Sequence, residues 1–368
     1  MTEKNKIVSK HLLSEELFDC ADRFKAAKPW TKLGEMQLFA VSWKDSYLYC
    51  SVCENSGLAV YPGEDGLFSL LKTLHLIETQ EQVGRALIES AYTQDCIQCS
   101  FVNRTDLDDW DHRCVIGSGH TYRGKQAWPQ FRRYRPLRYP WHIDEADEAQ
   151  LIEALKAATY LVGLLENQTY WKLLSQLTGQ PLHPIACLTE NAMEWGHLPC
   201  LTAQDEEPVY QLSAVKIPDH RDEHFTAPML TNELDIARLR KVKSTGETLQ
   251  CAITCLRMMI KDDAGGAPYV PLAFVMVAVR DMPTSRDANI GAMDLAMDYE
   301  SGVGRWMSKF CGYIEEHGKP RQVIANEYRT DHLLKRLCGQ LGIRYTFQEV
   351  PLQELNDAIN GFDERRKP

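Results

Sequence analysis

The chain has 368 residues, of which 44% are hydrophobic and 25% are charged. This length predicts two domains, each able to bury a core. The formal net charge of -10 argues against nucleic-acid binding over the whole surface, while a local basic patch remains compatible with it. No apolar run approaches the roughly 20 residues of a membrane-spanning helix, and the first residues lack the apolar core of a signal peptide. We therefore expect a cytoplasmic protein without a membrane segment.

Residues 1–177 are predicted to form an α+β domain. Amphipathic spacing predicts a helix at 11–27 with Ser14 as its cap, and uninterrupted helix formers predict the strongest helix of the chain at 145–168. Residues 103–147, between the last strand and this helix, are expected to be irregular. Further helices are predicted at 64–76, 80–92 and 170–177. Runs rich in aromatic and β-branched residues predict strands at 38–43, 47–54, 57–63 and 95–102.

Residues 178–246 are rich in proline and are predicted to form a connector that packs on the second domain. A strand is expected within it at 209–217 and a helix at 231–241. Residues 247–368 are predicted to form an α/β domain. Its elements follow the order β-β-β-α-β-α-β-α, with strands at 248–260, 269–279, 289–297, 321–327 and 343–350 and helices at 302–318, 330–342 and 351–361. This is the element order of a mixed, ribonuclease H-like sheet.

A ribonuclease H-like element order raises the hypothesis of a metal-dependent nuclease or other phosphoryl-transfer enzyme. Two-metal chemistry needs carboxylates that converge on ions about 4 Å apart, which would be magnesium or manganese. The first strand of this domain contains no acid, so the candidates are Asp281, Asp298 and Glu327. The competing interpretation is that these acids are solvated strand ends and helix faces.

A basic-aromatic segment at 114–143 holds six Lys or Arg residues and no acid. Arginine forks contact phosphates and aromatic rings stack on bases, so residues 123–141 are candidates for contact with nucleic acid or an acidic protein. In the structural alternative, the aromatic rings anchor a loop while the arginines pair with acids of the helix at 145–168. The candidate binding residues are Arg123, Lys125, Trp128, Arg132, Arg133 and Arg135.

Two smaller patterns lie beside this segment. The acids Asp106, Asp108, Asp109 and Asp111 are expected to cap a turn and to pair with the basic residues that follow. The turn at 117–120 reads Gly-Ser-Gly-His, which offers a ligand or a nucleophile, although serine and histidine in a loop more often serve structure.

Two CxxC pairs, Cys50 with Cys53 and Cys96 with Cys99, have the spacing of a zinc site. Both pairs lie in predicted strands without glycine or proline between the cysteines. Residues i and i+3 of a strand point to opposite faces, so we favour buried, reduced thiols and expect no metal. Cys251 and Cys255 share a face of their strand and are expected in the core.

The chain resembles a bacterial two-domain family whose paired domains have no assigned function. The resemblance rests on GLAVYPG (57–63), RGKQAWPQFRRYRP (123–136), PYVPLAFVMV (268–277) and GKPRQVIANE (318–327). It implies an architecture and supplies no catalytic residues. The leading hypothesis is therefore a non-catalytic binding protein without a cofactor, and the nuclease is its alternative.

Overall fold

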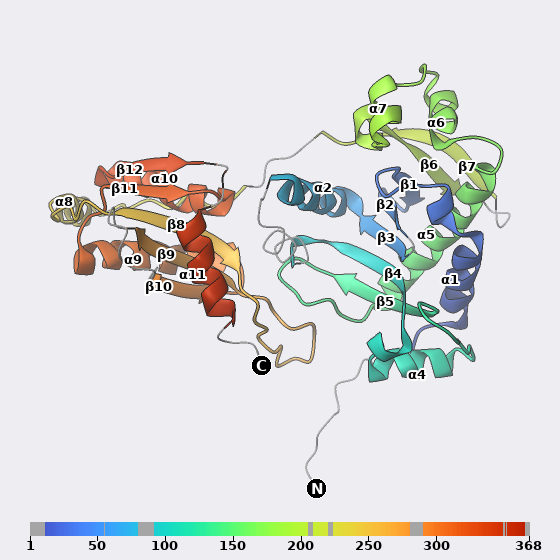
Figure 1. The fold of residues 1–368 in the computed structure, drawn as a ribbon, viewed down its shortest axis with the longest axis horizontal. Coiled ribbons are helices and arrows are strands. Elements are labelled where there is room, and N and C mark those ends of the chain that lie inside the picture. Colours follow the sequence, from blue (N-terminus) through green and yellow to red (C-terminus); the bar gives the residue numbers. More distant parts are fainter. Residues whose placement is uncertain are drawn as a thin grey trace, which may run out of the picture. The chain divides into compact units, whose positions relative to one another are not determined.

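The computed structural model describes residues 12–54, 56–79, 92–204, 209–219, 224–279, 290–348, 350 and 352–364 (Figure 1). Contacts divide these residues into two compact units. The first comprises 12–71, 94–136 and 140–219, and the second comprises 72–79, 92–93, 137–139 and the described residues from 224 onward. The helix predicted at 80–92 lies outside the described residues except for its last residue. Within the described residues, no helix is long and apolar enough to cross a membrane.

Seven strands form the mixed sheet of the first unit, in the spatial order β5-β4-β3-β2-β1-β6-β7. Neighbouring strands are antiparallel except β1 and β6, which are parallel. The four strands predicted from β-branched and aromatic runs are confirmed as β1 to β4. The bounds are β1 Phe39–Trp43, β2 Ser46–Cys53, β3 Gly57–Pro62, β4 Cys96–Val102, β5 Trp128–Tyr134, β6 His197–Ala203 and β7 Tyr210–Lys216.

Helices cover this sheet. The long helix α5 (Glu145–Leu164) contacts β1 to β4 and packs against α1 (Glu15–Ala27), as Figure 1 shows. Ser14 caps α1 as predicted, because its hydroxyl accepts a hydrogen bond from the backbone N–H of Leu17. The other helices are α2 Gly63–Thr79, α4 Asp109–Gly117, α6 Tyr170–Thr178 and α7 Pro184–Thr189, with 3-10 turns η1 Pro29–Thr31, η2 Arg104–Asp106 and η3 Ala192–Trp195.

The first half of the predicted connector is part of the first unit, so the expectation that all of 178–246 packs on the second domain is wrong. Strand β6 joins β1, and β7 pairs with β6. Strand β6 was not predicted from the sequence. It contains Pro199, and proline is disfavoured in an inner strand because it has no N–H to donate. The pairing of β6 with β1 covers only Cys200 and Leu201, so it begins one residue after Pro199.

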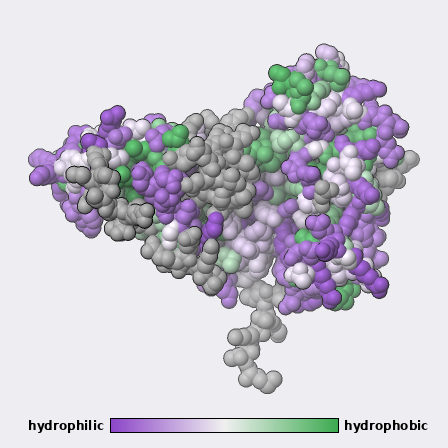
Figure 2. All heavy atoms as spheres, viewed as in Figure 1, coloured by the Kyte–Doolittle hydropathy of each residue, from purple (hydrophilic) through white to green (hydrophobic). Residues whose placement is uncertain are grey.

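Figure 2 shows hydrophobic surface over α7, where Leu182, Ile185 and Leu188 are exposed. Ile185 and Leu188 are three apart in α7 and so share one face of this short helix, while Leu182 precedes its N-cap His183. Ala186 on the same helix is buried. The segment therefore contributes little apolar area to the core of the first unit.

The second unit contains a five-stranded sheet in the order β10-β9-β8-β11-β12. Strands β8, β9 and β10 are antiparallel neighbours, whereas β8, β11 and β12 run parallel. The predicted element order is confirmed. The bounds are β8 Thr248–Cys255, β9 Leu272–Val279, β10 Ile290–Ala296, α9 Tyr299–His317, β11 Gln322–Ala325, α10 Tyr328–Leu341, β12 Arg344–Phe347 and α11 Gln353–Glu364, preceded by α8 Glu233–Arg240.

Helices pack on both faces of the second sheet, because its central strands are apolar on both sides. Cys251 and Cys255 of β8 lie in a core cluster with side chains of α9 and α10, as predicted for these two thiols. Ala252 of the same strand faces the other way, into a cluster with Leu355 and Ile359 of α11. Together the two units confirm an α+β first part and an α/β second part.

Candidate binding site in the basic-aromatic segment

The basic-aromatic segment contains a strand, so the expectation of an irregular region over 103–147 is wrong in part. It holds the end of α4 and all of β5, which is the edge strand of the first sheet. Phe131 is buried on the core side, its neighbours Gln130 and Arg132 lie on the opposite face of the strand, and Arg133 lies on the same face as Phe131. The outer edge of β5 is covered at Arg133, whose backbone exchanges two hydrogen bonds of 2.7 and 3.0 Å with Trp141.

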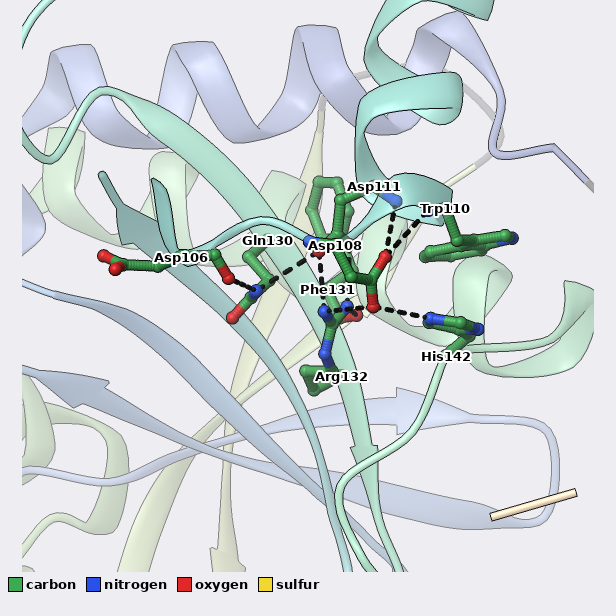
Figure 3. Close-up of polar contacts among 8 residues, drawn as sticks. All are labelled: Asp106, Asp108, Trp110, Asp111, Gln130, Phe131, Arg132 and His142. Carbon is green, nitrogen blue, oxygen red and sulfur yellow. Dashed lines mark hydrogen bonds and ion pairs between the residues drawn. The ribbon is translucent and has the colours of Figure 1, made fainter. Parts of the chain in front are cut away.

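Arg132 lies in a network of acids at the start of α4 (Figure 3). Its two terminal nitrogens donate to the two carboxylate oxygens of Asp111 at 2.7 and 2.6 Å. One of them also donates to Asp108 at 3.1 Å and the other to the carbonyl of Phe131 at 2.9 Å. The Arg132 side chain is 13% exposed and that of Asp111 only 3%. The two terminal nitrogens of Arg132 are therefore already hydrogen-bonded to groups of the protein itself.

The charges in this network reinforce one another. Burial alone would lower the pKa of the Arg132 guanidinium, but hydrogen bonding to Asp111 and the charges of Asp111 and Asp108 outweigh it and raise that pKa. Burial would likewise raise the pKa of Asp108. Hydrogen bonds from His142 and from the backbone of Asp111, with the charge of Arg132, lower the pKa of Asp108 instead. The Arg132 guanidinium and the Asp108 carboxylate are thus both held in their ionised forms.

His142 closes the network from the other side, as Figure 3 shows. Its Nε2 lies 2.9 Å from a carboxylate oxygen of Asp108, and its ring stacks on Trp110 with centroids 4.1 Å apart. The other oxygen of Asp108 accepts from the backbone N–H groups of Trp110 and Asp111, which caps α4. The prediction that the acids at 106–111 cap a turn and pair with the basic residues is confirmed for Asp108 and Asp111.

Arg133 and Arg135 pair with the helix that follows the segment. Arg133 forms ion pairs with Asp95 at 2.5 Å and with Asp147 of α5 at 3.2 Å, and its side chain is 12% exposed. Burial raises the pKa of Asp147, and the charge of Arg133 opposes that rise. Arg135 is 55% exposed and lies 3.7 Å from Asp144 and 3.9 Å from Asp147. The structural alternative is therefore confirmed for Arg133.

The remaining candidates are Arg123, Lys125 and Trp128, which lie at or just before the start of β5. Arg123 and Lys125 are exposed, and within the described residues neither makes a hydrogen bond or ion pair. Trp128 is half-buried, with Tyr122 at 5.8 Å between centroids and the guanidinium of Arg104 at 5.7 Å from its ring. We call Arg104, Tyr122, Arg123, Lys125 and Trp128 the basic-aromatic surface. Arg104 lies outside the basic segment in sequence, so spacing gave no signal for it.

The Gly-Ser-Gly-His turn lies beside this surface. His120 contacts Ser118 Oγ at 3.2 Å through Nδ1 and Asp19 at 3.2 Å through Nε2. The Ser118 hydroxyl is buried and donates to the carbonyl of Val115 at 2.9 Å, at the C-terminal end of α4. The hydroxyl is thus used to end a helix, and His120 ties this turn to α1.

The four cysteines of the CxxC pairs are not gathered into one site. They lie on β2 and β4, which are separated by β3. Among the described residues, no group of three or more His, Cys, Asp or Glu side chains could hold a metal ion. Burial raises the pKa of Cys50, Cys96 and Cys99, and burial with the charge of Glu35 raises the pKa of Cys53 to about 11. These environments favour neutral thiols over the thiolates that zinc needs.

The nuclease candidates of the second unit serve as helix caps where they are described. Asp298 caps α9 by accepting from the N–H of Ser301 at 2.7 Å. Glu327 caps α10, accepting from the N–H and the hydroxyl of Thr330 at 3.1 Å each and pairing with Arg329 at 2.6 Å. Asp281 lies outside the described residues. The two described carboxylates are therefore both used to cap helices.

Comparisons with known families agree with this two-domain architecture. Residues 15–177 match the family described as Domain of unknown function (DUF7309), and residues 235–363 match Domain of unknown function (DUF6930). The pairing confirms the predicted two-domain family with no assigned function. No curated protein matches the sequence.

Proposed function

We propose that the protein is a non-catalytic binding protein whose basic-aromatic surface contacts single-stranded nucleic acid. The observation that carries this proposal is the division among the basic residues of the first unit. Arg132 and Arg133 are occupied by acids of the same unit, whereas Arg123 and Lys125 are exposed beside an aromatic pair. Exposed cations supply phosphate contacts, and aromatic rings supply stacking that tolerates any base.

The rings favour a single strand over a duplex. Trp128 and Tyr122 are neighbours, so one base can stack against them while Arg104, Arg123 and Lys125 neutralise adjacent phosphates. The bases of a duplex are already stacked on each other and offer no free face. Because the chain carries a net charge of -10, binding depends on this local surface and weakens steeply with salt.

We further propose that the second unit is a ribonuclease H-like domain without nuclease activity. Its support is the sheet order β10-β9-β8-β11-β12, with three antiparallel strands extended by two parallel ones. The use of Asp298 and Glu327 as helix caps favours the non-catalytic version. Labelled DNA incubated with magnesium or manganese is expected to remain intact, and cleavage that Glu327→Gln abolishes would overturn this part.

The binding proposal is tested by fluorescence anisotropy of a labelled 12-nucleotide single strand between 25 and 200 mM salt. The double variant Arg123→Gln/Lys125→Gln should lower the slope of log K against log salt by about 1.4, because each phosphate contact on a single strand contributes about 0.7. The matched control Lys32→Gln/Lys172→Gln removes the same charge from two other exposed lysines and should leave the slope unchanged. Absence of binding at 25 mM salt, or equal slopes for the two double variants, would refute the proposal.

A further inference from the structure

Cations gather at one end of the second sheet, where β8, β11 and β12 begin (Figure 1). In-register parallel pairing places the starts of these three strands side by side. The segments that lead into β8 and β11 are also joined, because the N–H of Lys319 donates to the carbonyl of Lys243 and the carbonyl of Lys319 accepts from Thr245, both at 3.0 Å. We call the cations brought together here the basic end: Arg240, Lys241, Lys243, Lys319, Arg321 and Arg344.

Two of these cations serve the fold through neutral partners. Arg240 Nε donates to the carbonyl of Gln340 at 2.6 Å, near the end of α10, and Lys319 Nζ donates to the carbonyl of Arg240 at 3.0 Å, at the end of α8. Cations are stabilised at the carboxyl end of a helix, which accounts for the position of these two. A carbonyl carries no net charge, so these contacts do not neutralise either side chain.

Three other cations have no such structural role. The side chains of Lys241, Lys243 and Arg344 are exposed, and in the part of the chain that the structure describes they make no hydrogen bond or ion pair. They come from two separate segments, the one that leads into β8 and the start of β12. Support of the fold therefore does not account for their presence at one end of the sheet.

The acids close to the basic end do not balance it. Glu315 of α9 pairs at 2.8 Å with Arg238, which lies outside the basic end. The two further acids at this end of α9 and β8 are Glu316 and Glu247, against six cations. Because the whole chain carries a net charge of -10, a local excess of positive charge favours an anionic partner at this place.

We propose that the basic end binds the phosphate backbone of double-stranded nucleic acid. Neighbouring strands lie about 4.8 Å apart, so cations at the starts of β8 and β12 are separated by roughly 10 Å. The grooves of a duplex are about 6 and 12 Å wide, so cations at this spacing reach phosphates of both strands. The basic end contains no aromatic ring, so it lacks the stacking that holds single strands. Contacts to phosphates alone carry no sequence preference.

The basic end is separate from the other sites of the chain. Asp298 and Glu327 follow the carboxyl ends of β10 and β11, whereas the basic end precedes the amino ends of β8, β11 and β12. Duplex binding here therefore involves neither candidate carboxylate. The basic-aromatic surface belongs to the first unit, so duplex binding does not depend on the single-strand proposal.

The test is fluorescence anisotropy of a labelled 16-base-pair duplex with the full-length protein between 25 and 200 mM salt. The double variant Lys241→Gln/Lys243→Gln should lower the slope of log K against log salt by about 1.8, because each phosphate contact on a duplex contributes about 0.9. Arg344→Gln should lower the slope by about 0.9. The matched control Lys261→Gln/Lys309→Gln removes two exposed lysines, one beyond the carboxyl end of β8 and one within α9, and should leave the slope unchanged.

The two binding proposals can fail separately. Lys241→Gln/Lys243→Gln should leave the single-strand slope unchanged, and Arg123→Gln/Lys125→Gln should leave the duplex slope unchanged. Unlabelled duplex should compete better than poly-glutamate at equal charge, and equal competition would assign the basic end to an acidic protein and overturn the proposal. Absence of duplex binding at 25 mM salt, equal slopes for the Lys241/Lys243 variant and its control, or an unchanged slope for Arg344→Gln would also overturn it, whatever the outcome for single strands.

Discussion

Replacement of Arg132 by methionine should destabilise the first unit, because Arg132 neutralises a buried carboxylate. Asp111 is 3% exposed and accepts both terminal nitrogens of Arg132 at 2.7 and 2.6 Å. Without Arg132, the side chain of Asp111 keeps only the backbone N–H of Asp108 and the amide of Gln130, at 3.0 and 3.3 Å. Removal of one partner from a buried ion pair costs about 3–5 kcal/mol. We expect about 3 kcal/mol, since these two hydrogen bonds remain.

Urea denaturation followed by tryptophan fluorescence measures this loss. Every tryptophan except Trp306 lies in the first unit, so the signal reports mainly on that unit. The matched control is Arg135→Met, whose side chain is 55% exposed and whose ion pairs are 3.7 and 3.9 Å long. It should cost no more than about 0.5 kcal/mol. A loss for Arg132→Met no larger than for Arg135→Met would refute the assignment of Arg132 to the interior network.

A double-mutant cycle isolates the pair itself. Asp111→Asn removes the charge with little change of shape, and the Arg132→Met/Asp111→Asn double variant leaves neither charge unpaired. The double variant should therefore cost about 1–3 kcal/mol less than the sum of the two single variants. Additive losses would mean that the two side chains do not interact. That result would contradict the two short hydrogen bonds between Arg132 and Asp111.

Four further outcomes are expected. Gly57→Ala should lower the free energy of unfolding by more than about 3 kcal/mol or abolish folding, because the added Cβ would lie 1.8 Å from the backbone oxygen of Cys99. The control Gly163→Ala adds a Cβ with nothing within 4 Å and should stabilise α5 by up to about 1 kcal/mol in the same denaturation assay. Native alkylation of Cys53 at pH 8 should be about 100-fold slower than in the unfolded chain, because its pKa rises from 9.0 to about 11. Because the pKa of Asp108 is lower in the folded than in the unfolded chain, its ionised form stabilises the fold at pH values above the unfolded pKa of about 3.9. This stabilisation is lost as pH falls through the folded pKa. Asp108→Asn should therefore flatten the acid unfolding curve below about pH 4. Glu327→Gln should cost about 1–2 kcal/mol and speed amide exchange in the first turn of α10.

Much of the fold could be predicted from the sequence, because local patterns decide it. The alternating and β-branched runs of β1 to β4 and of β8 to β12 gave these strands. Two strands were missed for identifiable reasons. Pro199 argued against β6, and the dense arginines of β5 looked like a loop although Phe131 faces the core. The charged side chains of an edge strand can be accommodated when they reach water or an oppositely charged side chain. A high density of charges alone therefore does not exclude a strand.

The partners of the arginines could be predicted only as groups of acids and not residue by residue, because the fold decides which acid meets which arginine. Arg133 meets Asp95 from the start of β4 and Asp147 from α5. Arg132 meets Asp108 and Asp111 at the start of α4. The residue types that pair and one of the helices involved were predictable from local patterns. Only the three-dimensional arrangement distinguishes the arginines that form ion pairs with acids from those that remain exposed.

The central claim is that the basic residues of the first unit divide into an interior set and an exposed set. NMR of the arginine guanidinium groups tests it directly, with and without a 12-nucleotide single strand at 25 mM salt. Arg132 and Arg133 should show slow side-chain rotation and no shift on addition of the strand, whereas Arg123 should show averaged signals that shift. Fast rotation of all three, or a shift confined to Arg132 and Arg133, would contradict the claim.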